Sequence, residues 1–199
     1  MDLFNALPYE QRWIELRNGR LLWINDFMPP NEANSLMSCL KQVTPWSQEE
    51  IQLFGRMVKQ PRLQAWYGDK AYTYSGLTMP AIPMTETLDS IKLRCEDVAS
   101  QPFNSVLLNL YRDGQDSMGA HQDNEPELGS NPTIASLSLG ATRRFVLKHI
   151  HTGQTYRLEL SHGSLLIMAG EMQHFWKHSL PKTNQQIGER INLTFRMIY

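Results

Sequence analysis

Residues 190–196 have the sequence RINLTFR, in which polar and apolar side chains alternate without a break. Successive side chains of a β-strand point to opposite faces, so this order predicts a strand with one apolar face that packs in a core. The other face carries Arg190, Asn192, Thr194 and Arg196. In an ordinary amphipathic strand this polar face lies in water. If it points inward instead, its two arginines form a receptor for a dicarboxylate, because guanidinium groups bind carboxylates bidentately.

The same alternation runs through the part of the chain that follows Phe103. It predicts five more short strands, over residues 106–112, 133–139, 144–148, 155–160 and 164–168. Strands of this length and number are typical of an antiparallel barrel or sandwich.

The first half of the chain contributes helices. Apolar residues at helical spacing predict one helix over residues 31–43 and another over residues 85–100. Residues 19–24 suit a short strand, and Gly55 divides residues 51–58 into the two arms of a small hairpin. We therefore expect an α+β fold that is mainly β, in which N-terminal helices brace the β-rich part.

The composition is that of an ordinary globular domain. The chain has 199 residues, of which 41% are hydrophobic, and 19 basic against 20 acidic residues give a net charge of −1. This balance argues against coating nucleic acid by bulk charge, although a local basic groove is compatible with it. Two cysteines are too few for a disulfide framework. We expect one soluble, reduced, monomeric domain over residues 1–199 without a membrane partner, cytoplasmic and nucleoid-associated in a bacterium or nuclear in a eukaryote.

His121 and Asp123 are two residues apart in a segment without helical spacing. In an extended chain such residues project to the same face and can converge on one metal ion. A neutral histidine and a carboxylate are two members of the 2-His-1-carboxylate triad, which binds iron(II) and leaves coordination sites open. The alternative is a surface loop in which the histidine is hydrogen-bonded to the aspartate.

A third ligand must come from farther along the chain. His149 and His151 flank an expected hairpin turn, which favours a solvated turn, and His162 lies in another turn. His174 and His178 remain, both within QHFWKHSLP, and spacing alone does not separate them.

A second polar pair lies on the strand before the histidine motif. Asn109 and Tyr111 are two residues apart and share one face of the strand expected over residues 106–112. They form a pair similar to the polar face of residues 190–196. The alternative is a half-exposed strand anchored by the tyrosine.

Four motifs follow one another along the chain: NLYRDG at residues 109–114, HQDNE at 121–125, HSLP at 178–181 and RINLTFR at 190–196. In this order and spacing they resemble the AlkB family of iron(II)- and 2-oxoglutarate-dependent dioxygenases, for which O2 is the second cosubstrate. The resemblance covers about residues 50–199. It implies a double-stranded β-helix (jelly-roll) core over residues 103–199.

The resemblance implies a role for each matching residue. His121 and Asp123 resemble two iron ligands, and His178, the histidine before Ser-Leu-Pro, resembles the third. The side chains that would bind 2-oxoglutarate are Asn109, Tyr111, Arg190, Asn192, Thr194 and Arg196. In the family pattern Arg190 holds the distal carboxylate, and Arg196 engages the end that chelates iron.

Residues 50–80 resemble the substrate-recognition hairpin and lid of AlkB enzymes. By this match Tyr72 and Tyr74 would line a pocket for an extruded base, which aromatic side chains stabilise by stacking. Without it, they are core or edge-strand residues. Phe54 would be the apolar wedge that duplex-acting homologues insert into the base stack.

Three charged residues complete the expected substrate site. Glu125 resembles the acidic residue that faces the extruded base, where a carboxylate suits a cationic base such as N1-methyladenine or N3-methylcytosine. Its alternative is a solvated loop acid. Arg143 is a candidate for pocket or phosphate contacts and Arg62 for contacts with the nucleic-acid backbone, although both could equally be ordinary surface charges.

The function implied by the resemblance is DNA repair by direct reversal: oxidative demethylation of N-alkylated bases with release of formaldehyde. The Phe54 wedge favours duplex DNA over single strands, and RNA is an alternative substrate. Two further functions stay open. One is a 2-oxoglutarate oxygenase that acts on a protein or small molecule, and the other is a catalytically silent module that binds damaged bases.

Overall fold

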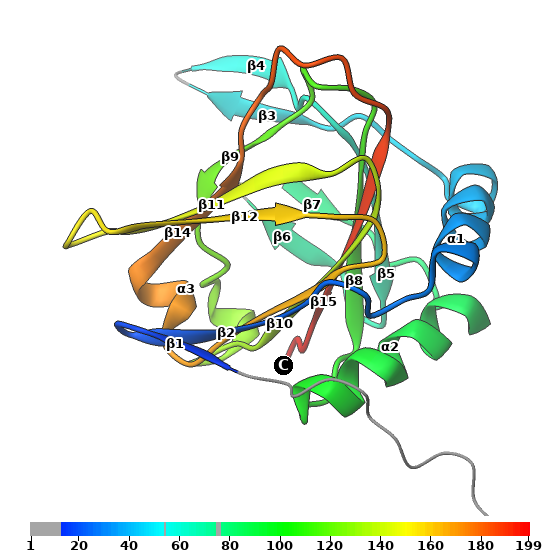
Figure 1. Ribbon diagram of the computed structural model, residues 1–199. Coiled ribbons are helices and arrows are strands. Elements are labelled where there is room, and N and C mark those ends of the chain that lie inside the picture. Colours follow the sequence, from blue (N-terminus) through cyan, green and yellow to red (C-terminus); the bar gives the residue numbers. More distant parts are fainter. Residues whose placement is uncertain (1–12, 54, 75–76) are drawn as a thin grey trace, which may run out of the picture.

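Two β-sheets face each other and build the centre of the molecule (Figure 1). The computed structural model describes residues 13–53, 55–74 and 77–199. The larger sheet has seven strands in the spatial order β1-β2-β13-β10-β15-β8-β5, all paired antiparallel. In chain order these strands are Ile14–Leu16 (β1), Gly19–Ile24 (β2), Leu63–Gly68 (β5), Ser105–Tyr111 (β8), Ile134–Gly140 (β10), Leu165–Ala169 (β13) and Arg190–Arg196 (β15).

The smaller sheet has four antiparallel strands in the order β12-β11-β14-β9. Their bounds are Met118–His121 (β9), Arg143–His149 (β11), Thr155–Leu160 (β12) and Trp176–Leu180 (β14). A cavity between the two sheets is lined by residues of both. This arrangement confirms the jelly-roll core and the mainly β fold class expected from the sequence.

Two helices cover the outer face of the larger sheet, α1 over Pro30–Val43 and α2 over Glu86–Ala99 (Figure 1). The apolar face of β15 belongs to the core beneath them, where Ile191, Leu193 and Phe195 are fully buried. Each such side chain contributes about 1.5–3 kcal/mol of transfer free energy. In the described part of the chain no helix is long and apolar enough to cross a membrane.

Two short hairpins and two short helical turns complete the described structure. The expected hairpin around Gly55, whose φ of 77° suits glycine, is confirmed. The remaining elements are β3 (Glu50–Leu53), β4 (Arg56–Lys59), β6 (Tyr72–Tyr74), β7 (Leu77–Met79), the 3-10 turn η1 (Pro126–Leu128) and α3 (Met172–Phe175).

The sheets contain strands that the sequence pattern did not predict. β5 pairs with β8, so the larger sheet extends beyond residues 103–199 into the segment expected to form the lid. β9 has the sequence MGAH, which is too short and small to show an alternation. In β14, buried Trp176, His178 and Leu180 do alternate with Lys177 and Ser179. Because the central inward residue is a histidine, a search for alternating hydrophobic side chains does not detect this strand.

His149 corrects the expectation of a solvated turn between β11 and β12. The side chain is 2% exposed, and its Nδ1 accepts hydrogen bonds from the backbone N–H groups of His151 and Thr152, each at 3.2 Å. His149 is buried because its ring folds over the turn that follows it and accepts hydrogen bonds from two backbone N–H groups of that turn. Burial, then the charges of Arg17 and His151, lower the pKa of His149.

The lowered pKa of His149 predicts a loss of stability in acid. The unfolded residue takes up a proton near pH 6.5 and the folded residue only at lower pH, so the unfolded state binds more protons in this window. The free energy of unfolding should therefore fall as the pH drops below about 6.5. His149→Asn keeps an acceptor for the turn but does not titrate. In urea denaturation we expect this variant to lose less stability than the wild type on acidification.

Because other histidines contribute equally to both proteins, the comparison isolates His149. Equal slopes for the wild type and His149→Asn would contradict the role assigned to His149.

Candidate metal centre

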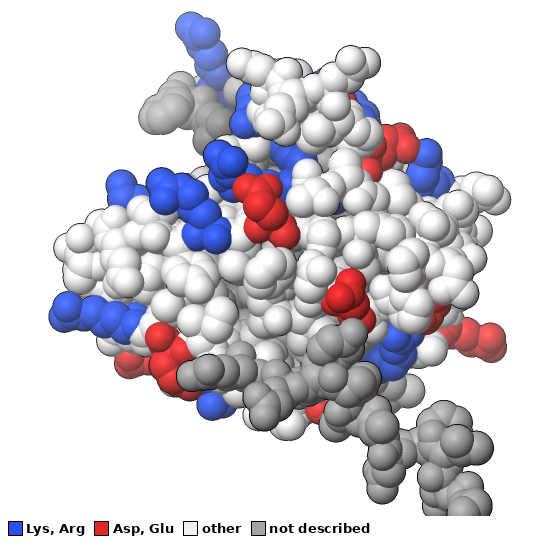
Figure 2. Space-filling view, viewed as in Figure 1, with Lys and Arg blue, Asp and Glu red and all other residues white. Residues whose placement is uncertain are grey.

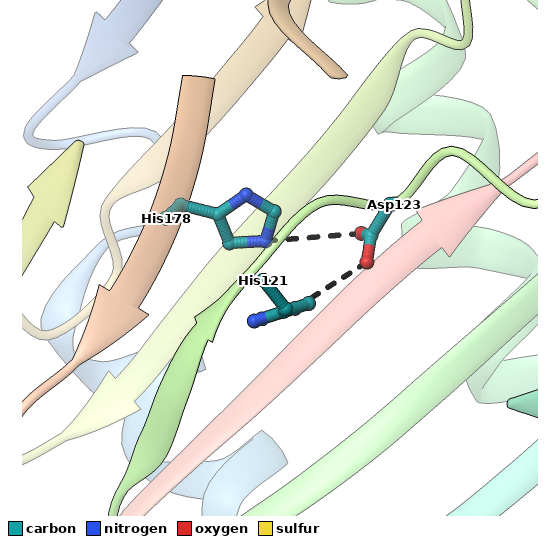
Figure 3. Close-up of side chains that lie close together, drawn as sticks. All are labelled: His121, Asp123 and His178. Carbon is teal, nitrogen blue, oxygen red and sulfur yellow. Dashed lines mark ion pairs between the residues drawn. The ribbon is translucent and has the colours of Figure 1, made fainter. Parts of the chain in front are cut away.

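Three side chains from two adjacent segments converge at one end of the smaller sheet (Figure 3). His121 at the end of β9 pairs in register with His178 on β14, and Asp123 follows two residues after β9 ends. The Asp123 carboxylate lies 3.4 Å from His121 Nε2 through Oδ1 and 4.0 Å from His178 Nε2 through Oδ2. One ligand atom from each residue lies within 4.8 Å of the others, so the three could hold one metal ion.

His174, the histidine that spacing left as an alternative, lies elsewhere. It is exposed on α3, and its Nε2 contacts the backbone carbonyl of Ser130. The in-register pairing of β9 with β14 therefore selects His178.

The electrostatics of the cluster favour metal ligation. Burial raises the pKa of the Asp123 carboxyl, but Arg196, whose Nη2 donates to Oδ2 at 2.8 Å, and the two histidines hold it well below its usual range. Burial lowers the pKa of His178 to about 3, so its ring is neutral and offers a lone pair. His121 Nδ1 lies 2.9 Å from the carbonyl of Gly119, to which only a protonated nitrogen can bond, so Nε2 is left as the ligand atom.

Two imidazoles and one carboxylate fit iron(II). This donor set occupies one face of the ion and leaves the remaining positions for other ligands. A structural zinc site would need a fourth protein ligand. Among the described residues the cluster has three.

The cavity between the sheets contains the metal cluster and the polar face of β15 together. All six side chains expected to bind 2-oxoglutarate line it, namely Asn109, Tyr111, Arg190, Asn192, Thr194 and Arg196. None of the six is more than 8% exposed. The polar faces of β8 and β15 therefore point inward, and the alternative of water-facing or half-exposed strands is wrong.

Arg190 offers an anion site at one end of this cavity. It is 2% exposed, its Nη2 donates to Ser138 Oγ at 2.9 Å, and its guanidinium carbon lies 5.4 Å from the centre of the Tyr111 ring. Its Nε has no hydrogen-bond partner among the described residues. Burial lowers the pKa of Arg190 to about 10, so it remains charged at neutral pH.

Arg62 corrects the expectation of a contact with the nucleic-acid backbone. The side chain is 3% exposed, lies beside His121 and Asp123 at the cavity wall, and donates from Nε to Asn109 Oδ1 at 2.9 Å. The recruitment of β5 into the larger sheet turns this arginine inward, away from the outer surface where phosphates would lie.

Arg143 is also buried, at 3% exposure, and contributes to structure instead of lining the cavity. Its guanidinium donates to the backbone carbonyls of Asp113, Asp116 and Pro181 at 3.1, 2.9 and 2.7 Å. These bonds tie the loop after β8 to the end of β14. The expected phosphate or pocket contact is therefore wrong for Arg143.

The remaining expected substrate residues are only partly described. Glu125 is half-buried, and its Oε2 is buried without a hydrogen-bond partner among the described residues. The backbone of Tyr72 and Tyr74 forms β6, whereas their side chains lie outside the described part. Phe54 lies outside it altogether.

Other residues of the cavity were missed by the sequence analysis. Ser136 Oγ accepts from Asn192 Nδ2 at 2.8 Å, and Ser138 Oγ accepts from Arg190. Both serines occupy alternate positions of a strand that was predicted, so the alternation itself could have identified them. Apolar lining residues such as Met118 and Met168 carry no comparable signal in the sequence.

Comparisons with known proteins agree with this geometry. Residues 20–196 match the 2OG-Fe(II) oxygenase superfamily. The chain is 42% identical to human alpha-ketoglutarate-dependent dioxygenase alkB homolog 3 over 183 residues, covering 87% of this chain and 64% of that protein. It is 43% identical to the human DNA oxidative demethylase ALKBH2 over 158 residues, which are 74% of this chain and 60% of the relative.

A plant relative and a solved structure extend the comparison. The Arabidopsis thaliana DNA oxidative demethylase ALKBH2 is 34% identical over 221 residues, covering 94% of this chain and 69% of that protein. The structure of OsALKBH1 superposes with a TM-score of 0.65 at 18% identity, over 92% of this chain and 100% of that one, which shows a shared fold. The chain spans less than two thirds of the length of human alkB homolog 3.

The cluster predicts metal-dependent stabilisation. Mn²⁺, used in place of iron(II) to avoid oxidation in air, should raise the Tm of the metal-free protein, because an ion held by the folded state alone stabilises it by about 2.7 kcal/mol at a concentration of 100 Kd. His178→Ala removes one ligand and should abolish most of this shift in a thermal melt. His174→Ala is the matched control and should retain it. A full shift in His178→Ala would contradict the site.

Proposed function

Because the chain belongs to the 2OG-Fe(II) oxygenase superfamily and, within it, to the AlkB family, we propose that it is a dioxygenase that demethylates N-alkylated bases in DNA. One observation carries the proposal: a single buried cavity joins three metal-ligating side chains to two inward-facing arginines. Two relatives are named DNA oxidative demethylases, and alkB homolog 3 is named an alpha-ketoglutarate-dependent dioxygenase.

In the proposed site, His121, Asp123 and His178 hold iron(II). Arg190 binds the distal carboxylate of 2-oxoglutarate through its unpartnered Nε, with Tyr111 and Asn192 beside it. Arg196 already pairs with Asp123, and it faces the metal end of the cosubstrate together with Asn109, with Thr194 in support. Iron(II) held there would supply oxygen activation, in which 2-oxoglutarate is converted to succinate and CO2 and takes up one oxygen atom of O2. The other oxygen atom would hydroxylate the N-methyl carbon, and the hydroxymethyl group would leave as formaldehyde.

Glu125 supports a cationic substrate. It lies two residues after Asp123, and its Oε2 is buried without a hydrogen-bond donor among the described residues. A buried acceptor left without a donor is unfavourable, and a cationic base with an exposed N–H would satisfy it. N1-methyladenine and N3-methylcytosine are cationic, whereas the normal bases are neutral. We therefore propose these two lesions as substrates.

Charge on the outer face of the smaller sheet supports a nucleic-acid partner. Figure 2 shows Lys and Arg side chains gathered on the left of the molecule, where β11, β12 and β14 lie. Exposed Lys148 on β11 is directly opposite exposed Lys177 on β14. Exposed Arg157 on β12 pairs with Val146, two residues before Lys148. Like charges directly opposite in a sheet are destabilising, and phosphate groups would relieve this repulsion.

Duplex DNA is the form of substrate that we propose. The β3–β4 hairpin carries exposed Arg56 and Lys59 on β4, as expected for an element that meets a phosphate backbone. Its sequence also resembles the hairpin by which duplex-acting homologues insert a wedge, which here would be Phe54.

The decisive experiment measures methyl loss from a duplex oligonucleotide that carries one N1-methyladenine. We expect loss only when iron(II) and 2-oxoglutarate are both present, faster on duplex DNA than on single-stranded DNA or RNA. His121→Ala should abolish it, with an unchanged circular dichroism spectrum as the control for folding.

The other outcomes distinguish the alternatives. Succinate formation without methyl loss would show a 2-oxoglutarate oxygenase that acts on a protein or small molecule. Binding of the lesion with neither methyl loss nor succinate formation would show a silent binding module.

Glu125→Gln tests the preference for a charged base. The substitution keeps the size and an acceptor oxygen but removes the negative charge. We expect kcat/KM on N1-methyladenine to fall by about tenfold, or 1.4 kcal/mol, and the rate on the neutral lesion N3-methylthymine to change much less. Equal losses on the two lesions would contradict electrostatic selection by Glu125.

A further inference from the structure

Asp123 carries a metal-ligating carboxylate but lies outside the β-ladder. β9 ends at His121, so the backbone of residues 122–123 has no strand partner. The carboxylate is 1% exposed and meets both histidines and Arg196, so its position must be defined closely. Ligand side chains with that requirement depend on neighbouring groups that orient them.

Gln173 supplies support for this segment from α3. Its side-chain Oε1 accepts the backbone N–H of Asp123 at 3.1 Å. In the opposite direction, Gln122 Nε2 donates to the backbone carbonyl of Gln173 at 3.0 Å. These two hydrogen bonds join segments 50 and 51 positions apart and hold both residues that follow β9.

The orientation of the Gln173 amide is itself fixed. The residue is 1% exposed, and its Nε2 lies 3.8 Å from the sulfur of Met168 on β13. Because the amide nitrogen is directed to this sulfur, the amide oxygen faces the N–H of Asp123. Met168 also lines the cavity, so the contacts run from the cavity wall through Gln173 to the ligand segment.

Gln173 is linked to two of the proposed ligands, to Asp123 by a hydrogen bond and to His178 through the chain. α3 leads directly into β14, and His178 lies five residues after Gln173. A displacement of α3 would therefore shift the backbone of Asp123 through hydrogen bonds and that of His178 through the chain.

We propose that Gln173 is a positioning residue of the metal centre, which sets the distance between Asp123 and His178 without ligating the metal. The inference rests on the proposed metal site. A neutral amide serves this purpose because it satisfies the buried N–H of Asp123 and adds no charge beside the carboxylate.

The test is a Mn²⁺ titration of the metal-free protein, in which electron paramagnetic resonance measures unbound Mn²⁺. Gln173→Met preserves the length of the side chain but cannot accept a hydrogen bond comparably well. We expect its Kd for Mn²⁺ to rise by about 10- to 100-fold, the range typical of groups that orient ligands. Hydrogen exchange at the Asp123 amide should accelerate in the same variant.

Asn104→Leu is the matched control. The side-chain amide of Asn104 also holds a distant backbone segment. It donates to the carbonyl of Ile198 at 2.7 Å and accepts the N–H of Ile198 at 2.8 Å. Asn104 does not line the cavity. This variant should lose stability and keep the wild-type Kd for Mn²⁺. A similar rise in Kd in both variants would show a general structural effect and overturn the proposal.

Gln173→Asn keeps a neutral amide but shortens the side chain by one methylene, so its oxygen should no longer reach the Asp123 N–H and its affinity for Mn²⁺ should also fall. It carries the test if Gln173→Met does not fold, and a folded Gln173→Asn protein with the wild-type Kd would overturn the proposal. Wild-type affinity in Gln173→Met would do the same. Failure of the wild type to bind Mn²⁺ would instead refute the metal site itself, so the two failures are distinguishable.

Discussion

The two-sided packing of β15 is the constraint on which the rest of the molecule depends. Its apolar side chains are fully buried beneath α1 and α2, and this burial fixes the rotation of the strand. The opposite side chains must then point into the space between the sheets. Burying four polar groups is unfavourable unless each finds a partner. Ser138 and Ser136 on the adjacent β10 accept from Arg190 and Asn192, and Asp123, in the segment after β9, accepts from Arg196. Thr194 donates to Asn192 on the same strand.

Charge balance explains why such a cavity suits a metal and a dicarboxylate together. The carboxylate of Asp123 is matched by Arg196, while Arg190 is a second buried cation. Iron(II) and 2-oxoglutarate carry opposite double charges, so binding both leaves the net charge of the cavity unchanged. Binding either one alone changes it by two charges in a medium that screens poorly. Arg62, buried beside Asp123 and Arg196, adds a further positive charge, so the cavity favours a dianionic cosubstrate beside the metal.

The sequence predicted those features that follow from alternation. We could predict most strand positions and the two faces of residues 190–196, because successive side chains of a β-strand point to opposite faces. Alternation could not show whether the polar face meets water or a cavity, because that depends on what packs against the other face. The choice of His178 over His174 likewise depends on the pairing of β14 with β9, a contact between distant segments.

Two of the errors concern buried charge. The sequence gives no sign that Arg62 and Arg143 are buried. The residue type does not distinguish an exposed arginine from one that donates hydrogen bonds to buried carbonyl groups. Burial arises when β5 joins the larger sheet and when three loop carbonyls converge on Arg143. Gln173 was missed for the same reason, since its partner is a backbone N–H, which every residue except proline possesses.

Most groups proposed for chemistry and for recognition lie on different parts of the fold, although Glu125 follows Asp123 by only two residues. The groups proposed to ligate the metal come from the smaller sheet and its adjoining segment, and the groups proposed for the cosubstrate come from the centre of the larger sheet. Both sets lie on paired strands or are tied to them by hydrogen bonds, which gives the geometric precision that ligation requires. The hairpins proposed to meet nucleic acid are separate two-stranded units. Changes in those hairpins could therefore alter the proposed substrate without disturbing the cavity, so the fold alone does not define which base the protein would accept.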